Sequence, residues 1–376
     1  MSSSDQRALE GEATEEANQV LGPYVVTQVV EDAPDGGYGW VQVGVAFTIN
    51  CFTWGQTAVS ITLIYFVYIP QCLTFIQSFG VYLAHYLSSN AFKNATPLDY
   101  ALVGGLQFSM SMLVAPLVTI TVRKFGTQIP MLAGIAVQTA GFIAASYSSR
   151  IQDVYISQGL VLGVGLGFIF VPSTPILAQW FSRRRSLAVG ISSSGSGIGG
   201  LLFSFISQAM IDNLSLAWAF RITAAIVGAM NLVAVALIRN RNRIILPSQR
   251  GFDTNILLRY DVCLFLAWGF ISMLGYITVL YSLPDFAESI NLSQSRAAAI
   301  SAFLNIGTAV GRPIIGLVSD RFGRIKVAAI LTMCSGLTCF AIWLPATNYA
   351  VTVLFAITNG AVVGVFWMVG VPESFT

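Results

Sequence analysis

Arg312 lies within a long apolar segment of the sequence, residues 297–318. An ionised arginine inside a membrane-spanning helix costs free energy, so such residues commonly belong to a functional site. Arg312 is therefore a candidate functional residue. A structural contact with another helix is the alternative role. Asn305 and Asn50 are further polar candidates for lining a cavity.

Other kinds of chemistry find little support in the sequence. The five cysteines lie in apolar segments and show neither a CxxC motif nor the paired spacing of a zinc site or a disulfide framework. There is no phosphate-binding loop of the form G-x-x-x-x-G-K-[ST]. One histidine and few buried acids leave little for hydrolytic chemistry. We therefore expect no enzyme activity, no cofactor, no metal and no nucleic-acid partner.

The segment 316–326, GLVSDRFGRIK, combines glycines, an acid and arginines at a fixed spacing. Gly316 would permit close helix contact, and Asp320 could pair with arginines or with helix ends. An ordinary basic cytoplasmic loop would explain the arginines but not the acid and the glycines. The pattern G-x-x-x-D-R-x-G-R resembles a signature of the major facilitator superfamily and predicts a cytoplasmic latch. Its predicted members are Gly316, Asp320, Arg321, Gly323 and Arg324.

The composition is that of an integral membrane protein. Hydrophobic residues make up 55% of the sequence, charged residues only 10%, and the mean hydropathy is +0.72, which leaves too little polar surface for a water-soluble globule. A helix of about 20 apolar residues crosses a hydrocarbon core of ~30 Å. We therefore expect an all-α bundle in a lipid bilayer. Its ten predicted spans are 40–59, 101–122, 129–148, 153–179, 186–211, 216–238, 260–283, 297–318, 327–345 and 350–371.

Positive charge is distributed unevenly over the loops that join these spans. Thirteen lysines and arginines fall in alternate loops, against three in the intervening loops. Because basic loops stay in the cytoplasm, this pattern places the thirteen on the cytoplasmic side. One span before the loop around residue 93 then puts the N-terminus in the cytoplasm as well. The tail, 1–38, carries eight acids and one arginine and is expected to be disordered.

Small residues recur in the fourth and fifth spans. Gly159, Gly163 and Gly167 are each four residues apart, and GISSSGSGIGG occupies 190–200. Faces of small residues let helices approach closely in lipid. Pro172 and Pro175 should break the fourth span near its cytoplasmic end.

Four motifs stand at the ends of predicted spans. DGGYGW precedes the first span, WFSRRRSLAVGISSSGSGIGG leads into the fifth, and SFGVYLAHYL and LNIGTAVGRPIIGLVSDRFGRIK complete the set. Together they resemble the monocarboxylate transporter family, most closely its fungal branch, over residues 35–368. The resemblance implies two six-helix halves, a central substrate cavity and alternating access. The motif residues are Asp35, Gly36, Gly37, Trp40, Arg183, Arg184, Arg185 and Gly190.

The resemblance also bears on the substrate site. It implies that Arg312 binds the substrate carboxylate, because an arginine at this point of the eighth helix does so in the family. Proton-coupled members have an acid one turn earlier, where this chain has Thr308, and a lysine in the first span, which this chain lacks. Thr308 is kept as a candidate substrate-binding residue. Proton coupling therefore stays open, and lactate is not assigned as the substrate.

The chain departs from a twelve-helix layout in two places. Residues 59–77 interrupt the first helix, and their codons can include the donor, branch-point and acceptor sites of a short fungal intron. We interpret this segment as a translated intron, with a genuine bent or re-entrant insertion as the alternative. Two helices are expected beyond the last span, which indicates a C-terminal truncation. The predicted layout is a tail 1–38, a six-helix half 39–238, a basic cytoplasmic linker 239–259 and an incomplete four-helix half 260–376.

The function that these patterns predict is secondary active transport of a small organic anion, a monocarboxylate or related metabolite. The alternatives are a non-transporting sensor or receptor on the same scaffold and an inactive mis-spliced product. A sensor would be favoured by a long cytoplasmic signalling tail, and the chain has only short cytoplasmic segments. The plasma membrane is the expected location, and the oligomeric state is not predicted.

Overall fold

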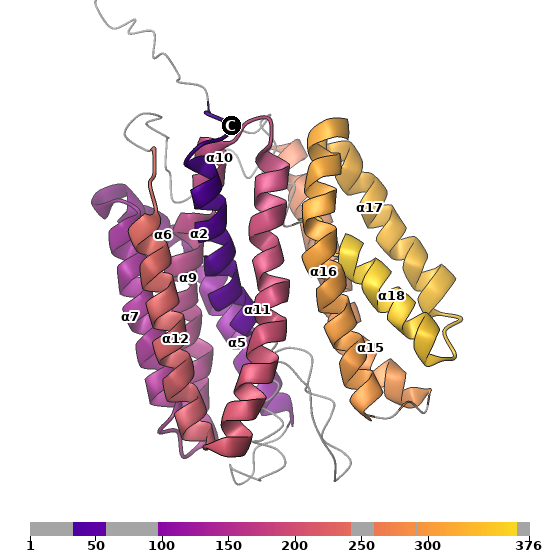
Figure 1. Cartoon of the computed structure of the whole chain (residues 1–376), viewed down its shortest axis with the longest axis horizontal. Helices are drawn as coiled ribbons and strands as arrows, with labels where there is room; N and C mark the ends of the chain where they lie inside the picture. The colour runs from indigo at the N-terminus through magenta and orange to yellow at the C-terminus, as the bar shows by residue number, and fades with distance from the viewer. Residues whose placement is uncertain (1–32, 58–96, 242–258, 291, 293, 367–376) are drawn as a thin grey trace, which may run out of the picture.

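The structure is a computed structural model that describes residues 33–57, 97–241, 259–290, 292 and 294–366 (Figure 1). Over these residues the chain forms helices joined by turns and short loops, and no strand. The expected all-α class is therefore confirmed. Most of the acidic tail, the segment 59–77 and most of the linker lie outside the described residues, so their interpretation stays a prediction.

The helices fall into two groups that lie side by side (Figure 1). The first group is α2 (Gly39–Phe52), α3 (Trp54–Thr57), α5 (Pro97–Leu113), α6 (Ala115–Phe125), α7 (Gln128–Ala145), α8 (Ile151–Val154), the π-helix η2 (Tyr155–Val161), α9 (Leu162–Ser173), α10 (Ile176–Trp180), α11 (Arg185–Asn213) and α12 (Leu216–Leu237). The second group is α15 (Tyr260–Ser289), α16 (Gln294–Phe322), α17 (Arg324–Thr338), the π-helix η3 (Cys339–Trp343) and α18 (Tyr349–Val362). We call these groups the N-terminal and C-terminal halves.

Each predicted span overlaps a helix or a series of helices. Among the described residues, six helical stretches are long and apolar enough to cross a membrane, and the bent pair α5 and α6 raises the number to seven. Two further apolar helices are shorter, Tyr260–Tyr276 and Tyr349–Val362. The chain is thus a multi-pass membrane protein, and the total of ten crossings stays a prediction.

Prolines mark two of the interruptions. The axes of α5 and α6 differ by 41°, and Pro116 lies in the first turn of α6. In the fourth span α9 ends at Ser173, and Pro175 directly precedes α10. Proline has no backbone N–H to donate and its ring clashes with the preceding turn, so a helix bends or ends there. The break near Pro172 and Pro175 was predicted, whereas the bend before Pro116 was not.

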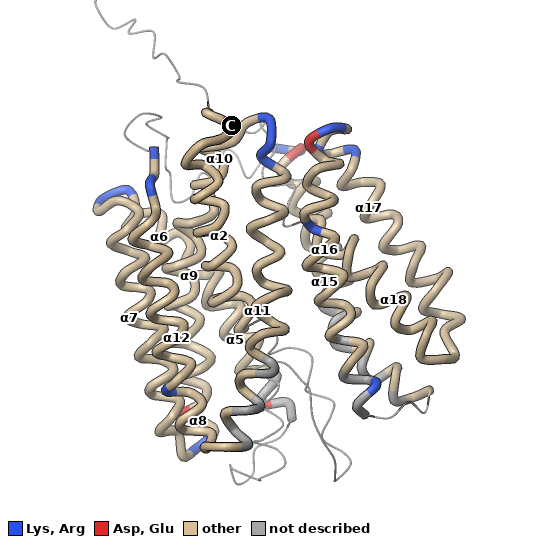
Figure 2. Tube along the Cα trace, in the orientation of Figure 1, with Lys and Arg blue, Asp and Glu red and all other residues tan. Residues whose placement is uncertain are grey.

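Lysine and arginine residues gather at one end of the bundle, where the loops α6–α7, α10–α11 and α16–α17 lie (Figure 2). We call this the basic end. The opposite end holds fewer positive charges in the described residues, including Arg150 at the start of α8. This arrangement agrees with the predicted alternation of charge, so the basic end is the one that we expect to face the cytoplasm.

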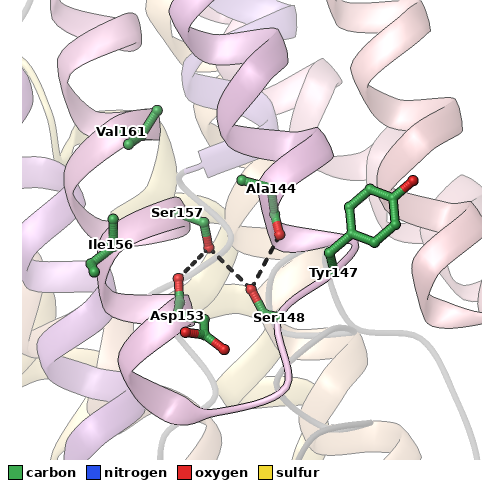
Figure 3. Close-up of a pocket in the computed structure, with 7 residues that line it drawn as sticks. All are labelled: Ala144, Tyr147, Ser148, Asp153, Ile156, Ser157 and Val161. Carbon is green, nitrogen blue, oxygen red and sulfur yellow. Dashed lines mark hydrogen bonds between the residues drawn. The ribbon is translucent and has the colours of Figure 1, made fainter.

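A hollow of about 390 Å³ opens next to η2 and the end of α7, at the opposite end (Figure 3). The hydroxyl oxygens of Ser148 and Ser157 lie 3.4 Å apart there, and Ser157 donates to the carbonyl oxygen of Asp153 at 2.6 Å. None of the residues predicted for a substrate site or a latch lines this hollow. Its lining residues are Ala144, Tyr147, Ser148, Asp153, Ile156, Ser157 and Val161.

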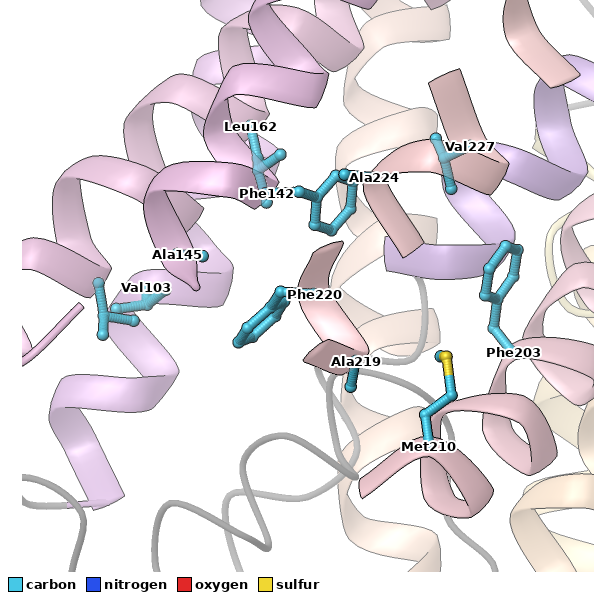
Figure 4. Packing of buried hydrophobic residues seen from close by; sticks show 11 residues of the cluster. Val103, Phe142, Ala145, Leu162, Phe203, Met210, Ala219, Phe220, Ala224 and Val227 are labelled. Atoms are coloured by element: carbon cyan, nitrogen blue, oxygen red, sulfur yellow. The ribbon is translucent and has the colours of Figure 1, made fainter. Parts of the chain in front are cut away.

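Each half has its own apolar packing. In the N-terminal half one cluster joins α5, α7, α11 and α12 through residues such as Phe142, Phe203 and Phe220 (Figure 4). In the C-terminal half another cluster joins α15, α16 and α18 around Leu283 and Phe355. Among the described residues, no cluster of buried apolar side chains combines the two halves. The halves are therefore separate packing units.

Glycines allow very close packing inside the N-terminal half. A methyl group added at Gly163 would lie 2.6 Å from the carbonyl oxygen of Gln107 on α5, and one at Gly167 would lie 2.6 Å from that of Ser111. These distances are shorter than a carbon–oxygen contact allows, so only glycine fits at these two positions. The predicted small face of the fourth span is thus a contact surface for α5.

We predict that Gly163→Ala destabilises the folded chain in detergent. The added methyl group would push α9 away from α5, and overpacking of this kind typically costs about 1–3 kcal/mol. The melting temperature, measured by size-exclusion chromatography after heating, should fall. The matched control is Gly105→Ala on α5, where an added methyl group meets no atom within 4 Å. Equal melting temperatures for the two variants would contradict the close packing.

Candidate functional site

The two halves meet along α11 and α16 (Figure 1). Glycines bring the two backbones together at three levels, where a methyl group added at the glycine would lie 2.5 to 2.9 Å from a carbonyl oxygen of the other helix. The pairs are Gly316 with Ser186, Gly190 with Arg312, and Gly197 with Asn305. Residue numbers rise along α11 as they fall along α16, so the helices are antiparallel. In Figure 1 they lie close near the basic end and separate toward the opposite end.

A second glycine contact joins α16 to α18 within the C-terminal half. A methyl group added at Gly307 or Gly311 would clash with the backbone of α18, and one at Gly360 would clash with the backbone of α16. α16 therefore has little room to move against α18. The glycine contacts thus fix α16, the helix that faces the N-terminal half, to the rest of the C-terminal half.

Asp320 lies at the basic end of the contact between the halves. Its Oδ1 accepts a hydrogen bond from the amide of Ser186 at 2.9 Å, and its Oδ2 accepts one from the amide of Leu187 at 2.8 Å. Both amides belong to the first turn of α11, where backbone N–H groups have no partner within the helix and the helix dipole favours a negative charge. A carboxylate of one half thus caps a helix of the other half.

The other predicted latch residues differ in what they contact. Arg324 Nε donates to the hydroxyl oxygen of Ser186 at 3.2 Å, and its Nη2 donates to the carbonyl oxygen of Ser182 at 3.1 Å. Gly323 connects α16 to α17 with a φ of +97°, which glycine adopts without steric cost. Arg321 lies over the ring of its neighbour Phe322 at 5.6 Å. The contact between the halves described here uses Asp320 and Arg324.

The motif DGGYGW packs against the motif that leads into α11. Asp35 accepts hydrogen bonds from the amides of Ser182, Arg183 and Arg184, at 2.9 to 3.3 Å. The Trp40 ring meets the Phe181 ring edge-on at 5.1 Å. The two motifs, about 140 residues apart in the chain, thus form one structure at the basic end.

The glycines of these motifs form a turn, and two of the arginines have exposed side chains. Gly36 and Gly37 form the turn before α2, and Gly37 has a φ of +57°. The side chains of Arg183 and Arg184 are exposed, and Arg185 begins α11. Their charges face outward, while the backbone of the segment faces the carboxylates.

Arg312 lies between the halves, farther from the basic end. The residue is only 8% exposed. Its Nη1 donates to the carbonyl oxygen of Ser193 at 2.7 Å and to the hydroxyl oxygen of Ser196 at 2.8 Å, both on α11. Among the described residues its Nε and Nη2 have no hydrogen-bond partner, and no carboxylate pairs with it.

The remaining predicted site residues lie on different faces. Thr308 is buried and its hydroxyl contacts the carbonyl oxygen of Gly360 on α18 at 3.1 Å, so it faces the C-terminal half rather than α11. Asn305 is half-buried, and its backbone carbonyl oxygen lies against α11. Asn50 donates to the carbonyl oxygen of Ala46 within α2 at 2.8 Å. The structure therefore brings Arg312 and Asn305 to one interface and places Thr308 and Asn50 elsewhere.

Two residues of this interface were missed in the sequence, Ser193 and Ser196. Both lie in the serine- and glycine-rich stretch of α11, which was interpreted only as a packing surface. The signal for a polar role was the serine content itself, because a helix face that only needs small residues can use alanine. That signal does not identify the partner, which comes from the other half.

Comparison with known proteins shows the family to which the chain belongs. The family described as Major Facilitator Superfamily matches residues 45–372. "Probable transporter MCH2" of Saccharomyces cerevisiae is 33% identical over 347 residues, covering 91% of this chain and 69% of that protein. "Uncharacterized transporter ESBP6" of the same yeast is 33% identical over 351 residues, covering 90% of this chain but only 49% of that protein. "MFS-type transporter opdF" of Penicillium oxalicum is 26% identical over 293 residues, covering 73% of this chain and 66% of that protein.

The protein is a multi-helix membrane bundle. Its two halves pack separately and are joined by a contact lined with glycines. The chain belongs to the major facilitator superfamily, as the match over most of its length shows. These relatives come from fungi, which agrees with the resemblance to the fungal monocarboxylate-transporter-like branch. The chain spans about half the length of one of the two yeast relatives.

We predict that Asp320→Asn opens the basic end of the contact between the halves. The amide keeps the size of the side chain but loses the charge and one of the two acceptor oxygens. A hydrogen bond to a charged group contributes about 1.5–3 kcal/mol, so the open form should become about tenfold or more populated. The reporter is Ser193→Cys in a background without native cysteines, since Ser193 is 8% exposed in the closed contact.

The measurement is the rate of labelling by a thiol reagent added only at the basic end, in membrane vesicles of defined orientation. Asp261→Asn is the matched control, because Asp261 lies at the same end but pairs with Arg259 inside the C-terminal half, at 3.1 Å. Faster labelling is expected for Asp320→Asn alone. An unchanged rate would show that Asp320 does not hold the halves together.

Proposed function

We propose that this chain belongs to a secondary transporter that moves a small organic anion, a monocarboxylate or a related metabolite, by alternating access. Membership of the superfamily and the printed names of the relatives support transport. The observation that carries the substrate class is Arg312, a buried cation between the halves.

The surroundings of Arg312 favour an anion. Its partners on α11, a carbonyl oxygen and a hydroxyl oxygen, are neutral. Removing a charge from water without a counter-ion costs free energy. Among the described residues, no negatively charged side chain pairs with the positive charge of Arg312. A carboxylate would supply the missing charge and could occupy the Nε and Nη2 positions as a bidentate ligand. Asn305, seven residues earlier on α16, lies at the same interface through its backbone carbonyl oxygen.

The same residue can connect binding to movement. In the described form Arg312 is bonded to α11, and Asp320 holds the basic ends together. A carboxylate bound at Nε and Nη2 would neutralise the guanidinium and so weaken the hydrogen bonds that Nη1 donates to Ser193 and Ser196, which join the halves. A ligand shifts a conformational equilibrium by as much as its affinity differs between the two forms. Substrate binding would thus promote separation of α11 from α16.

Thr308 has no role in proton transfer in this proposal. Its hydroxyl is engaged between α16 and α18 and does not titrate near neutral pH. The basic end would face the cytoplasm, with the plasma membrane as the expected location.

We predict that Arg312→Lys lowers the affinity for monocarboxylates at least tenfold, and that Arg312→Gln lowers it further. Lysine keeps the positive charge but loses the planar fork that binds both carboxylate oxygens. Two measurements are needed, uptake across a panel of labelled monocarboxylates and the rise in melting temperature that each ligand causes in the purified protein.

The matched control is Arg221→Lys. Arg221 lies on α12 at the end of the bundle opposite to the basic end. Its Nε donates to the hydroxyl oxygen of Ser146 at 3.3 Å, and its guanidinium lies over the Tyr147 ring at 4.8 Å. It should leave uptake and ligand-induced stabilisation unchanged. Uptake of monocarboxylates by Arg312→Gln at the unsubstituted level would contradict the assignment of Arg312.

A further inference from the structure

The backbone segment Ser182–Leu187 is held by two carboxylates that come from different halves. Asp35 of the N-terminal half accepts from the amides of residues 182 to 184, and Asp320 of the C-terminal half accepts from the amides of 186 and 187. The contact of Asp35 lies within one half, so it can persist when the halves separate. The contact of Asp320 joins the halves and must break.

We infer that Asp35 is a positioning residue for the latch: it holds the entry to α11 in the conformation in which Asp320 can cap the helix. This inference rests on the alternating-access part of the proposed function and not on the identity of the substrate. Consecutive amides that converge on one carboxylate form an anion-binding concavity, and the carboxylate fixes the course of that backbone. The next two amides along the chain are those that Asp320 accepts from.

Asp35 is itself fixed in place by the motif around it. Its own amide donates to the carbonyl oxygen of Trp180 at 3.0 Å. The Tyr38 ring lies 5.8 Å from the Trp180 ring, and the Tyr38 hydroxyl donates to the carbonyl oxygen of Leu237 at 2.9 Å. Phe181, next in the chain, is fully buried against Gly39. The carboxylate is therefore held by α2, α10 and the end of α12 together.

Two features of Asp35 indicate that its position is specific. Its φ is +48°, a left-handed conformation that is unfavourable for most residues other than glycine and is tolerated best by asparagine and aspartate. The segment that it binds carries three successive arginines, 183–185, whose mutual repulsion a nearby negative charge reduces. An asparagine at this place would keep the backbone geometry but would lose the charge and one acceptor oxygen.

The first experiment compares Asp35→Asn, Asp320→Asn and the double variant, each with the Ser193→Cys reporter labelled from the basic end. Asp35→Asn should label at least threefold faster than the unsubstituted reporter. The double variant should label no faster than Asp320→Asn alone, because Asp35 acts through the same contact. The labelling needs no substrate, so it can succeed even if carboxylate transport is disproved.

The matched control is Asp153→Asn. Asp153 also accepts from two backbone amides before a helix, those of Ser149 and Arg150 at 3.0 and 2.9 Å, but it does so at the opposite end. It should leave labelling at the basic end unchanged. Unchanged labelling in Asp35→Asn, or an effect that multiplies fully with that of Asp320→Asn, would overturn the inference.

A second measurement needs no substitution at Asp35. Amide hydrogen exchange is compared between the unsubstituted chain and Asp320→Asn. Amides 186 and 187 should exchange faster in the variant, whereas amides 182 to 184 should keep their protection. Loss of protection across the whole segment would show that Asp35 does not hold it independently of the latch, and this too would overturn the inference.

Discussion

The contact between α11 and α16 is the constraint on which the rest of the structure depends. In lipid there is no hydrophobic force that drives two helices together, so their association relies on close packing and hydrogen bonds. Gly190, Gly197 and Gly316 allow the two backbones to touch. The polar contacts of half-buried Asp320 and buried Arg312 then act across a short distance between the two helices. These hydrogen bonds stabilise the contact between the halves, and their small number allows them to break together.

The distribution of packing indicates where movement would be concentrated in the proposed mechanism. The apolar clusters of the described residues each belong to one half, and glycine contacts fix α9 to α5 and α16 to α18. The interface between the halves also has glycine contacts, but among the described residues it adds to them only a few hydrogen bonds and no cluster of buried apolar side chains. Rocking of two rigid halves around such an interface exposes a central site to one side at a time. Asp35 and Asp320 illustrate the division, since one carboxylate serves a half and the other joins the two.

Much of the fold was predictable because each helix satisfies its own backbone and needs only an apolar segment of sufficient length. The break near Pro172 and Pro175 and the close approach at Gly163 and Gly167 follow from local chemistry in the same way. Elements that depend on distant residues were not predictable. The π-helices η2 and η3 have no local signal that we could identify.

The candidate site shows the same limit. The residue types at Arg312 and Asp320 indicated an anion site and a latch, but their partners lie more than 110 residues away along the chain. Periodicity shows that a helix has a polar face and not which helix that face will meet. Thr308 illustrates this, because it is one turn from Arg312 and yet contacts α18.

The proposed mechanism requires α11 and α16 to separate at the basic end when a carboxylate binds. The most direct test is a distance distribution from electron paramagnetic resonance, with spin labels at Arg183→Cys and Phe322→Cys, both exposed at that end. We predict a short distance between the labels that dominates without ligand and a longer one that gains population when a monocarboxylate is added. A single distance that does not change with any carboxylate would contradict it.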